Sequence, residues 1–304
     1  MKGFIISGAG GFIGRNILST IGGKLPVLAV SSDAAKLKAF AGTPSLDVLS
    51  NEDFFNKKLD LSGYVLIHLA YVRSHDFPVM KASLDFTREL LEKAQAAGIT
   101  QVVHISSQSV YDDKREHPAK ETDLVIPTNL YDIGKYYLEN WIRDFSGVHN
   151  MKYINLRIAS LVGRGFEQRI TTRLIKNGLA EGRITINRNG KVFSYTHVSD
   201  IVQGILAAAR IPDEAWNRTY NVGTSERYTL EGIADAIARE FESRKLTLTV
   251  ERIPTEQNSE NSSLDSSAFQ KAAGWTAAMS LADIVREETG FQLEQGEAGR
   301  CIRN

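Results

Sequence analysis

The chain opens with a short apolar run that breaks into glycines and then resumes with helical spacing. Phe4, Ile5 and Ile6 are too few for a helix but suit a buried parallel strand. The glycines that follow let the backbone turn sharply and approach a ligand without a Cβ in the way. Behind them, apolar residues recur at helical spacing: Phe12, Ile13, Ile17, Leu18 and Ile21. This stretch predicts a strand, a tight turn and a helix whose N-terminus points at an anion such as a pyrophosphate.

The glycines of this turn are spaced three residues apart, at Gly8, Gly11 and Gly14. The better-known Gly-x-Gly-x-x-Gly pattern does not fit from Gly8, because Ile13 stands where its third glycine would fall. A glycine pattern alone is also compatible with an ordinary strand-to-helix turn. Its position between a strand and a helix favours dinucleotide binding.

Short apolar segments then alternate with longer amphipathic ones. We expect strands at Pro26–Val30, Ser45–Val48, Tyr64–Ala70, Gln101–Ser106 and Tyr153–Ile158. Helices are expected at Ala34–Phe40 with Asp33 as N-cap, at Met80–Ala97 closed by Gly98, and at Leu130–Phe145. This alternation predicts an α/β fold with a doubly wound, Rossmann-like parallel sheet.

The pattern becomes irregular beyond residue 160. A helix is expected at Ile201–Ala209, a strand at Thr219–Gly223, a helix at Leu230–Phe241, a strand at Leu246–Arg252 and a polar surface loop over residues 256–267. We expect residues 1–160 to form a dinucleotide-binding domain. Residues 161–304 would form mainly a smaller C-terminal α/β substrate lobe, with residues 192–223 returning to the Rossmann domain.

Composition excludes several classes of partner. Thirty-six basic residues balance thirty-six acidic ones, so no global field attracts nucleic acid or an anionic membrane. The sequence starts without a signal-peptide pattern, and no run approaches the length of a membrane span. A single cysteine, Cys301, excludes an internal disulfide, and the histidines lack metal-ligand spacing. We therefore expect a cytoplasmic protein without a catalytic metal.

One group of residues in the sequence has the side chains needed for catalysis. The strand expected at 101–106 ends in hydroxyls, among them Ser107. Tyr131 and Lys135 are four residues apart, on one face of a helix. The lysine ammonium, helped by a positive nicotinamide ring, would stabilise a phenolate whose pKa is ordinarily about 10. The tyrosine could then exchange a proton with a sugar hydroxyl or ketone while a hydride moves, and the serine would hold the reacting oxygen.

With these residues in order, the chain resembles an extended short-chain dehydrogenase/reductase of the NAD-dependent epimerase/dehydratase group. The resemblance covers nearly the whole length and includes the glycines at 8, 11 and 14, the Ser106–Tyr111 stretch, Tyr131 with Lys135, Tyr195–Asp200, Tyr220–Gly223, and Gly274 with Trp275. It implies that Tyr131 is the general acid/base and that Lys135 binds the nicotinamide ribose. It also implies that Ser107 hydrogen-bonds the substrate oxygen.

The resemblance also implies the lining of the ligand sites. The implied cofactor residues are Gly8, Gly11, Phe12, Ile13, Gly14, Arg15, Ser31, Ser32, Asp47, Val48, Leu69, Ala70, Tyr71, Ser83, Tyr131 and Lys135, with Asp47 and Val48 beside the adenine. The implied substrate residues are Ser107, Ser160 and Arg164. The implied substrate is a nucleotide sugar, with hydride transfer at a carbinol or ketone carbon, C4.

Two departures from the family pattern bear on cofactor and reaction. Ser31 and Ser32 stand where NAD-preferring members carry an acidic residue, and Arg15 could pair with a 2′-phosphate, which favours NADP over NAD. Arg15 could equally be a solvated helix residue. Gln108 and Ser109 replace the acidic pair of members that eliminate water, which disfavours a dehydratase. A keto-sugar reductase or an epimerase remains, and NADP would favour the reductase.

A third departure keeps other functions open. Phe193 stands where many nucleotide-sugar members carry a diphosphate-binding arginine, and residues 255–263 contain no basic residue. Possible substitutes are Arg164, Arg169, Arg173 and Arg252. The alternatives are a reductase of a carbonyl substrate without a nucleotide, and a non-catalytic NAD(P)-sensing protein. The resemblance further implies a homodimer through the two long helices, with Leu84, Leu91, Tyr137 and Trp141 as candidate contacts.

Overall fold

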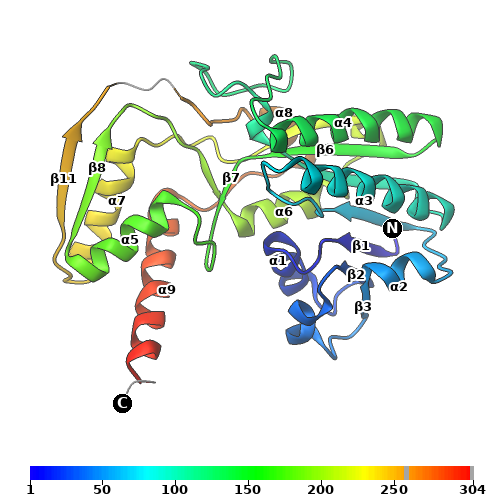
Figure 1. Cartoon of the computed structure of the whole chain (residues 1–304), viewed down its shortest axis with the longest axis horizontal. Coiled ribbons are helices and arrows are strands. Elements are labelled where there is room, and N and C mark those ends of the chain that lie inside the picture. The colour runs from blue at the N-terminus through cyan, green and yellow to red at the C-terminus, as the bar shows by residue number, and fades with distance from the viewer. Residues whose placement is uncertain (257–259, 302–304) are drawn as a thin grey trace.

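A computed structural model describes residues 1–256 and 260–301. Seven parallel strands form one sheet in the order β10-β6-β5-β4-β1-β2-β3, which confirms the predicted fold class (Figure 1). Their bounds are β1 Gly3–Ser7, β2 Val27–Ser31, β3 Leu46–Ser50, β4 Tyr64–His68, β5 Gln101–Ser107, β6 Lys152–Ile158 and β10 Arg218–Val222. The chain reverses its direction of winding between β1 and β4, which is where ligands bind in doubly wound sheets.

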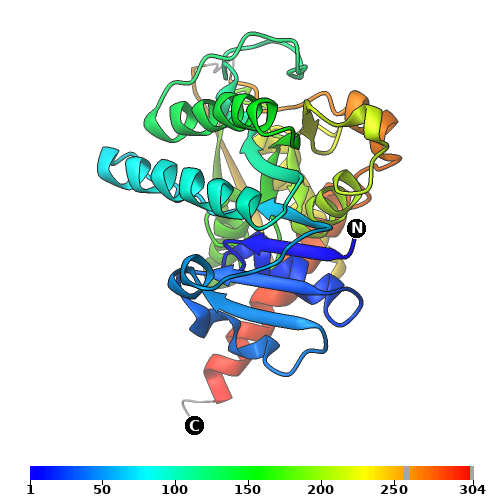
Figure 2. The ribbon, with the colours of Figure 1, turned by 90° about the vertical axis from the view of Figure 1, so that its right-hand side faces the viewer.

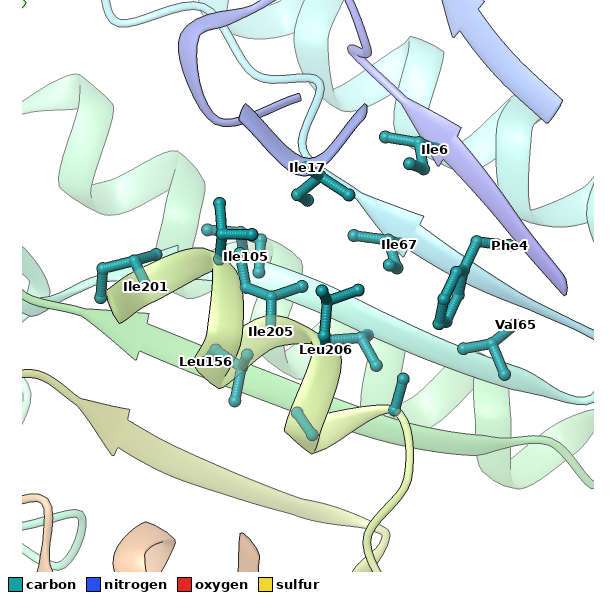
Figure 3. Packing of buried hydrophobic residues seen from close by; sticks show 14 of the residues in the cluster. Phe4, Ile6, Ile17, Val65, Ile67, Ile105, Leu156, Ile201, Ile205 and Leu206 are labelled. Atoms are coloured by element: carbon teal, nitrogen blue, oxygen red, sulfur yellow. The ribbon is translucent and has the colours of Figure 1, made fainter. Parts of the chain in front are cut away.

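Helices cover both faces of this sheet because successive strand side chains point to opposite sides. Phe4 and Ile6 pack with α1 (Phe12–Ile21) and α6 (Val198–Ala208), in the cluster shown in Figure 3. Ile5 packs on the other face, which is covered by α2 (Asn51–Asn56), α3 (Phe77–Ala96) and α4 (Leu130–Val148). Helices α3 and α4 lie side by side there (Figure 1, Figure 2). The inner strands β1, β2 and β4 are buried on both faces, so each of them is a nearly unbroken apolar run in the sequence.

A second group of elements forms a smaller cluster, at the left of Figure 1. Strands β8 (Arg183–Arg188) and β11 (Thr249–Pro254) pair in parallel and pack with α5 (Ile170–Glu181), α7 (Leu230–Ser243) and α9 (Leu281–Cys301). The remaining elements are β7 (Ser160–Val162), which pairs with β9 (Tyr195–His197), the helix α8 (Ser267–Ala273), and the 3-10 helices η1 (Ala34–Phe40), η2 (Gln108–Val110) and η3 (Asp213–Ala215).

Several elements differ from the prediction. The segment after Asp33 is a 3-10 helix, although Asp33 caps it as expected, accepting a 3.1 Å hydrogen bond from the Ala35 amide. The last strand begins at Thr249 rather than Leu246. The sequence pattern did not predict α2, α5, α9, β7, β8 or β9. Positions 257–259 of the expected loop lie outside the described residues. No helix in the described ranges is both long and apolar enough to cross a membrane.

Candidate active site

Glycine is required in the turn after β1 because the backbone packs against itself there. Gly8 has a φ of +74°, and a Cβ on it would lie 2.8 Å from the backbone nitrogen of Ala70. A Cβ on Gly14 would lie 2.5 Å from the carbonyl oxygen of Ala9. Neither position can therefore carry a side chain unless the backbone moves. The N-cap of α1 is Gly11, which offers no capping side chain, so the first amides of the helix are left for another acceptor such as an anion.

A cavity of about 630 Å³ lies in front of this turn, at the carboxyl ends of β1, β2 and β4. We call it the glycine cavity, and its volume is typical of a ligand site. Of the predicted cofactor residues, those that line it are Gly8, Gly11, Ser31, Ser32, Leu69, Ala70, Tyr71 and Ser83. The sequence reading missed Gly10, Asp33, Lys36, Asn51, Val72, Pro78, Val79, Ala82 and Phe86.

Four predicted cofactor side chains, Phe12, Arg15, Asp47 and Val48, are absent from the lining of the glycine cavity and from that of the neighbouring cavity around Tyr131. Asp47 is exposed on β3, and Val48 packs against the hydrophobic core. Neither lines the cavity, whereas Asn51, at the start of α2, does. Arg15 is exposed on α1 and is also absent from the lining. The cation that lines the cavity is Lys36 of η1, 3.7 Å from the carboxylate of Asp33.

A second cavity, of about 340 Å³, contains the three predicted catalytic residues, and we call it the tyrosine cavity. Ser107 comes from the end of β5, and Tyr131 and Lys135 come from the first turns of α4. Its full lining is Ile13, Leu69, Tyr71, Arg73, Ile105, Ser106, Ser107, Gln108, Ser109, Tyr131, Lys135, Ile158, Ala159, Ser160, Leu161, Phe166, Gln168 and Arg169. Leu69 and Tyr71 line both this cavity and the glycine cavity, so the two are neighbours.

The groups around Tyr131 shift its pKa in opposite directions. Burial raises the pKa of Tyr131, whereas the charge of Arg73 and a hydrogen bond with Ser107 lower it. The guanidinium carbon of Arg73 lies 5.6 Å from the centre of the tyrosine ring. Ser107 in turn shares a 2.7 Å hydrogen bond with the hydroxyl of Ser109. The cation with the largest effect on the pKa of Tyr131 is therefore Arg73, and not Lys135 as the sequence pattern suggests.

Lys135 is buried beside the tyrosine. Its ammonium donates a 2.6 Å hydrogen bond to the carbonyl of Ile105 and lies 4.6 Å from the centre of the Tyr71 ring. Burial lowers the pKa of Lys135 to about 7, and Glu139, one turn further along α4, opposes this shift. Lys135 can therefore change its charge near neutral pH, which is typical of functional sites.

A buried polar network fixes α4 against the sheet. Glu139 accepts a 2.7 Å hydrogen bond from Arg157 Nη2 and a 2.5 Å hydrogen bond from the hydroxyl of Ser106. Arg157 also donates to the Tyr111 hydroxyl at 2.8 Å, and Tyr111 donates to Asn221 at 2.8 Å. Buried charges are tolerated when they are paired and hydrogen-bonded in this way. The network joins α4, β5, β6 and β10 behind the tyrosine cavity.

A third, polar cavity of about 280 Å³ adjoins the tyrosine cavity and shares with it Arg73, Gln108, Ser109, Ser160 and Arg169. Ser160 therefore lines both cavities. Arg164 lines neither of them, and its exposed side chain pairs with Glu294 and lies over the ring of Phe291. Arg169, five residues later, lines both cavities instead.

Two of the cavity-lining residues that were not predicted, Lys36 and Arg73, could have been identified from their position just after a strand. Lys36 and Arg73 both follow the carboxyl ends of parallel strands, β2 and β4, where ligands bind in this architecture. Arg169 was named from the sequence only as one of four possible substitutes for the diphosphate-binding arginine. No strand end marked it, because it lies between β7 and α5, two elements that were not predicted.

The chain is similar to known proteins of one family. Residues 4–223 match the model of the NAD dependent epimerase/dehydratase family. An uncharacterized UDP-glucose epimerase, YtcB, of Bacillus subtilis is 28% identical over 245 residues, covering 77% of this chain and 76% of that protein. The UDP-glucose 4-epimerase of Mus musculus is 26% identical over 283 residues, covering 84% of this chain and 80% of that protein.

Solved structures show the same fold. The UDP-glucuronic acid 4-epimerase of Bacillus cereus, in complex with UDP-glucuronic acid and NAD, aligns with a TM-score of 0.79 at 19% identity. The alignment covers 96% of this chain and 99% of that chain.

Proposed function

Because the chain belongs to the NAD dependent epimerase/dehydratase family, we propose that it is an NAD(P)-dependent epimerase or keto-reductase of a nucleotide-activated sugar. A hydride moves at a carbinol or ketone carbon of the sugar, C4. The observation that carries the proposal is the placement of Ser107, Tyr131 and Lys135 in one cavity that borders the glycine cavity.

The glycine cavity fits the dinucleotide of this family. Glycine at position 8 lets the turn pack against the backbone of Ala70, and the free amides at the start of α1 suit a pyrophosphate. The neighbouring tyrosine cavity then receives the nicotinamide end, which supplies the hydride acceptor or donor when it is bound.

The chain's own residues handle the proton. The Tyr131 hydroxyl, as phenolate, takes the proton of the sugar hydroxyl during oxidation and returns it during reduction. Ser107, which is hydrogen-bonded to Tyr131, holds the reacting oxygen. Arg73 favours the phenolate because its positive charge lowers the pKa of Tyr131.

The lining of the tyrosine cavity supports hydride transfer without elimination of water. Dehydration needs an acid and a base beside the sugar, and none of the residues that line this cavity is acidic. Gln108 and Ser109, which replace the acidic pair of dehydratases, both line it. An epimerase or a reductase accords with this lining better than a dehydratase.

We further propose NADP as the preferred cofactor. Ser31 and Ser32 line the glycine cavity and carry no charge that would repel a 2′-phosphate. Lys36, rather than Arg15, offers the cation for that phosphate. Asp33 also lines the cavity, but its carboxylate lies 3.7 Å from the Lys36 ammonium, which compensates its charge.

A homodimer through α3 and α4 also remains a proposal. Leu91 is fully buried in the core, so it is not available for a dimer contact. Leu84 and Trp141 are partly buried against the core, whereas Tyr137 is 52% exposed. Sedimentation equilibrium at micromolar concentration tests the dimer, and a monomeric mass contradicts it.

The experiment that tests the function uses Tyr131→Phe. The purified variant and wild type are incubated with UDP-glucose and its 4-keto form, deuterated NAD(P)H is added, and deuterium at C4 is read by mass spectrometry. We expect incorporation to fall by about 100- to 10,000-fold, because the acid/base is lost, with NAD(P) binding retained. Tyr153→Phe removes a hydroxyl outside the cavity linings and serves as the control. Full activity of Tyr131→Phe refutes the role, and cofactor binding without hydride exchange in wild type favours a sensor.

A further inference from the structure

The charged side chains that line the tyrosine cavity all carry positive charge. Three of the side chains that line it are cationic, Arg73, Lys135 and Arg169, and none is acidic. Within residues 1–256 and 260–301, no carboxylate lies within ion-pair distance of Arg73 or Arg169. Surface arginines elsewhere do find such partners, as Arg143 does with Asp144.

Arg169 is held in place although it has no counter-ion. Its Nε donates a 2.7 Å hydrogen bond to the carbonyl of Leu161. Its guanidinium carbon lies 5.3 Å from the centre of the Phe166 ring and 5.9 Å from that of Tyr195. In the described part of the chain, its two terminal nitrogens make no hydrogen bond. The contacts therefore orient the planar end of the side chain and leave its outer N–H groups for a ligand.

Such an arrangement is unfavourable without a ligand. Burial lowers the pKa of Arg169, and the nearby charge of Arg73 lowers it further. Arg169 is half-buried and Arg73 is exposed, so the cost of an unpaired charge falls mainly on Arg169, and a bound anion offsets it. Two guanidinium groups present several planar N–H donors, which match the two oxygens of a carboxylate.

The position of the arginines relative to Tyr131 restricts where the anion is attached. Arg73 lies over the Tyr131 ring, which acts at the reacting carbon. In a pyranose, a C6 carboxylate is carried by the carbon next to C4, whereas the diphosphate is attached across the ring at C1. The adjoining polar cavity is mixed in charge, because its lining contains Asp113, Asp132 and Glu260 as well as Lys191 and the two arginines, whereas the charged residues that line the tyrosine cavity are all cations. An anion is therefore best placed beside the reacting carbon.

Resting on the proposed function, we propose that Arg73 and Arg169 bind a carboxylate on the sugar ring, so that the preferred substrate is a nucleotide-activated uronic acid. A neutral hexose would leave both guanidinium groups without an anionic partner, and that of Arg169 is half-buried. The two arginines thus determine specificity between acidic and neutral sugars.

The test compares UDP-glucuronic acid with UDP-glucose for wild type, Arg169→Gln, Arg169→Lys and Arg73→Gln, each with added dinucleotide. Arg143→Gln removes a charge from the exposed face of α4 and is the control. We expect Arg169→Gln to lower kcat/KM for the acidic sugar by about 10- to 100-fold, as expected for lost charge-assisted hydrogen bonds, and for the neutral sugar by less than about threefold. Arg169→Lys should recover part of the loss. Arg73→Gln should slow both sugars through Tyr131 and still reduce the acidic-to-neutral ratio.

Three outcomes overturn the proposal. Equal losses for both sugars in Arg169→Gln would assign the arginine to a group that both substrates share, such as the diphosphate, and unchanged kcat/KM values for both sugars would remove it from substrate binding. Calorimetric binding of the two sugar nucleotides is measured as well, because it does not depend on turnover. If wild type turns over neither sugar, the proposed function fails, while tighter binding of UDP-glucuronic acid that Arg169→Gln abolishes would still support the carboxylate site. Binding of neither sugar nucleotide refutes both.

Discussion

Replacing Glu139 by glutamine tests the buried network behind the active site. The Glu139 and Arg157 side chains are only 4% and 6% exposed, and three hydrogen bonds from Arg157 end on the carboxylate, at 2.7, 3.0 and 3.1 Å. Glutamine keeps the volume but removes the charge, so the buried guanidinium loses its counter-ion. Breaking a buried ion pair on one side destabilises a protein by about 3–5 kcal/mol. That is a large share of a typical stability of about 5–15 kcal/mol.

The same substitution should change the active site through Lys135. Burial lowers the pKa of Lys135 to about 7, and Glu139 is the group that opposes this effect. Without Glu139 the pKa of Lys135 falls further, so less of the lysine is charged at pH 7. We expect the limb of the pH–activity profile that reports Lys135 to move to lower pH in Glu139→Gln.

Urea unfolding followed by tryptophan fluorescence measures the stability effect. Glu89→Gln, on the exposed face of α3, is the matched control and should change the free energy of unfolding by less than about 0.5 kcal/mol. The double variant Glu139→Gln with Arg157→Met removes both charges and should recover most of the loss. A loss below about 1 kcal/mol in Glu139→Gln, or a double variant less stable than the single one, would refute this account of the network.

Three further predictions concern single residues. Burial lowers the pKa of Lys135 from 10.5 to about 7, so the unfolded chain binds more protons between these values, and the stability contributed by this group rises with pH across that window. The stability gained by Lys135→Met over wild type should therefore shrink between pH 7 and 10 in urea unfolding, and a constant difference contradicts this. Lys36→Gln should weaken NADP binding about tenfold while NAD binding stays within about twofold, measured by fluorescence titration; equal effects on both refute the 2′-phosphate contact. Gly134→Ala would place a Cβ 1.8 Å from the Tyr71 hydroxyl, so turnover should fall more than tenfold, whereas Gly147→Ala on the same helix has open space and should keep full turnover; full activity of Gly134→Ala would contradict this role of Tyr71.

The features predictable from sequence were those with a local period or a local steric requirement. The turn at Gly8 can be predicted from the glycines that directly follow β1 in the sequence. Strand β1 is recognisable as a short apolar run because both of its faces are covered. The four-residue spacing of Tyr131 and Lys135 on a helix likewise places both in one cavity. Each of these can be recognised from a few consecutive positions of the sequence, even where the contact that explains it, such as that of Gly8 with Ala70, is made with a distant segment.

The features that escaped prediction depend on contacts between distant segments. Arg164 and Arg169 are chemically alike and five residues apart, and only the pairing of β7 with β9 and the position of α9 determine which one lines the cavity. The pKa of Tyr131 is another case, because Arg73 reaches it from the loop after β4 rather than from its own helix. Sequence spacing carries no information on either contact.

The buried network gives a physical reason why motifs more than a hundred residues apart occur together in this chain. Asn221 touches none of the three cavities, yet its side chain accepts from Tyr111 and donates to the carbonyls of Ala119 and Asp265. Through Tyr111 and Arg157 these bonds lead to Glu139, one helical turn from Lys135. A shift in the edge strand β10 would therefore be transmitted to α4, which carries both Tyr131, the proposed acid/base, and Lys135. The residues of this hydrogen-bonded network act as positioning residues. The precise geometry of the site depends on all of these hydrogen bonds being made.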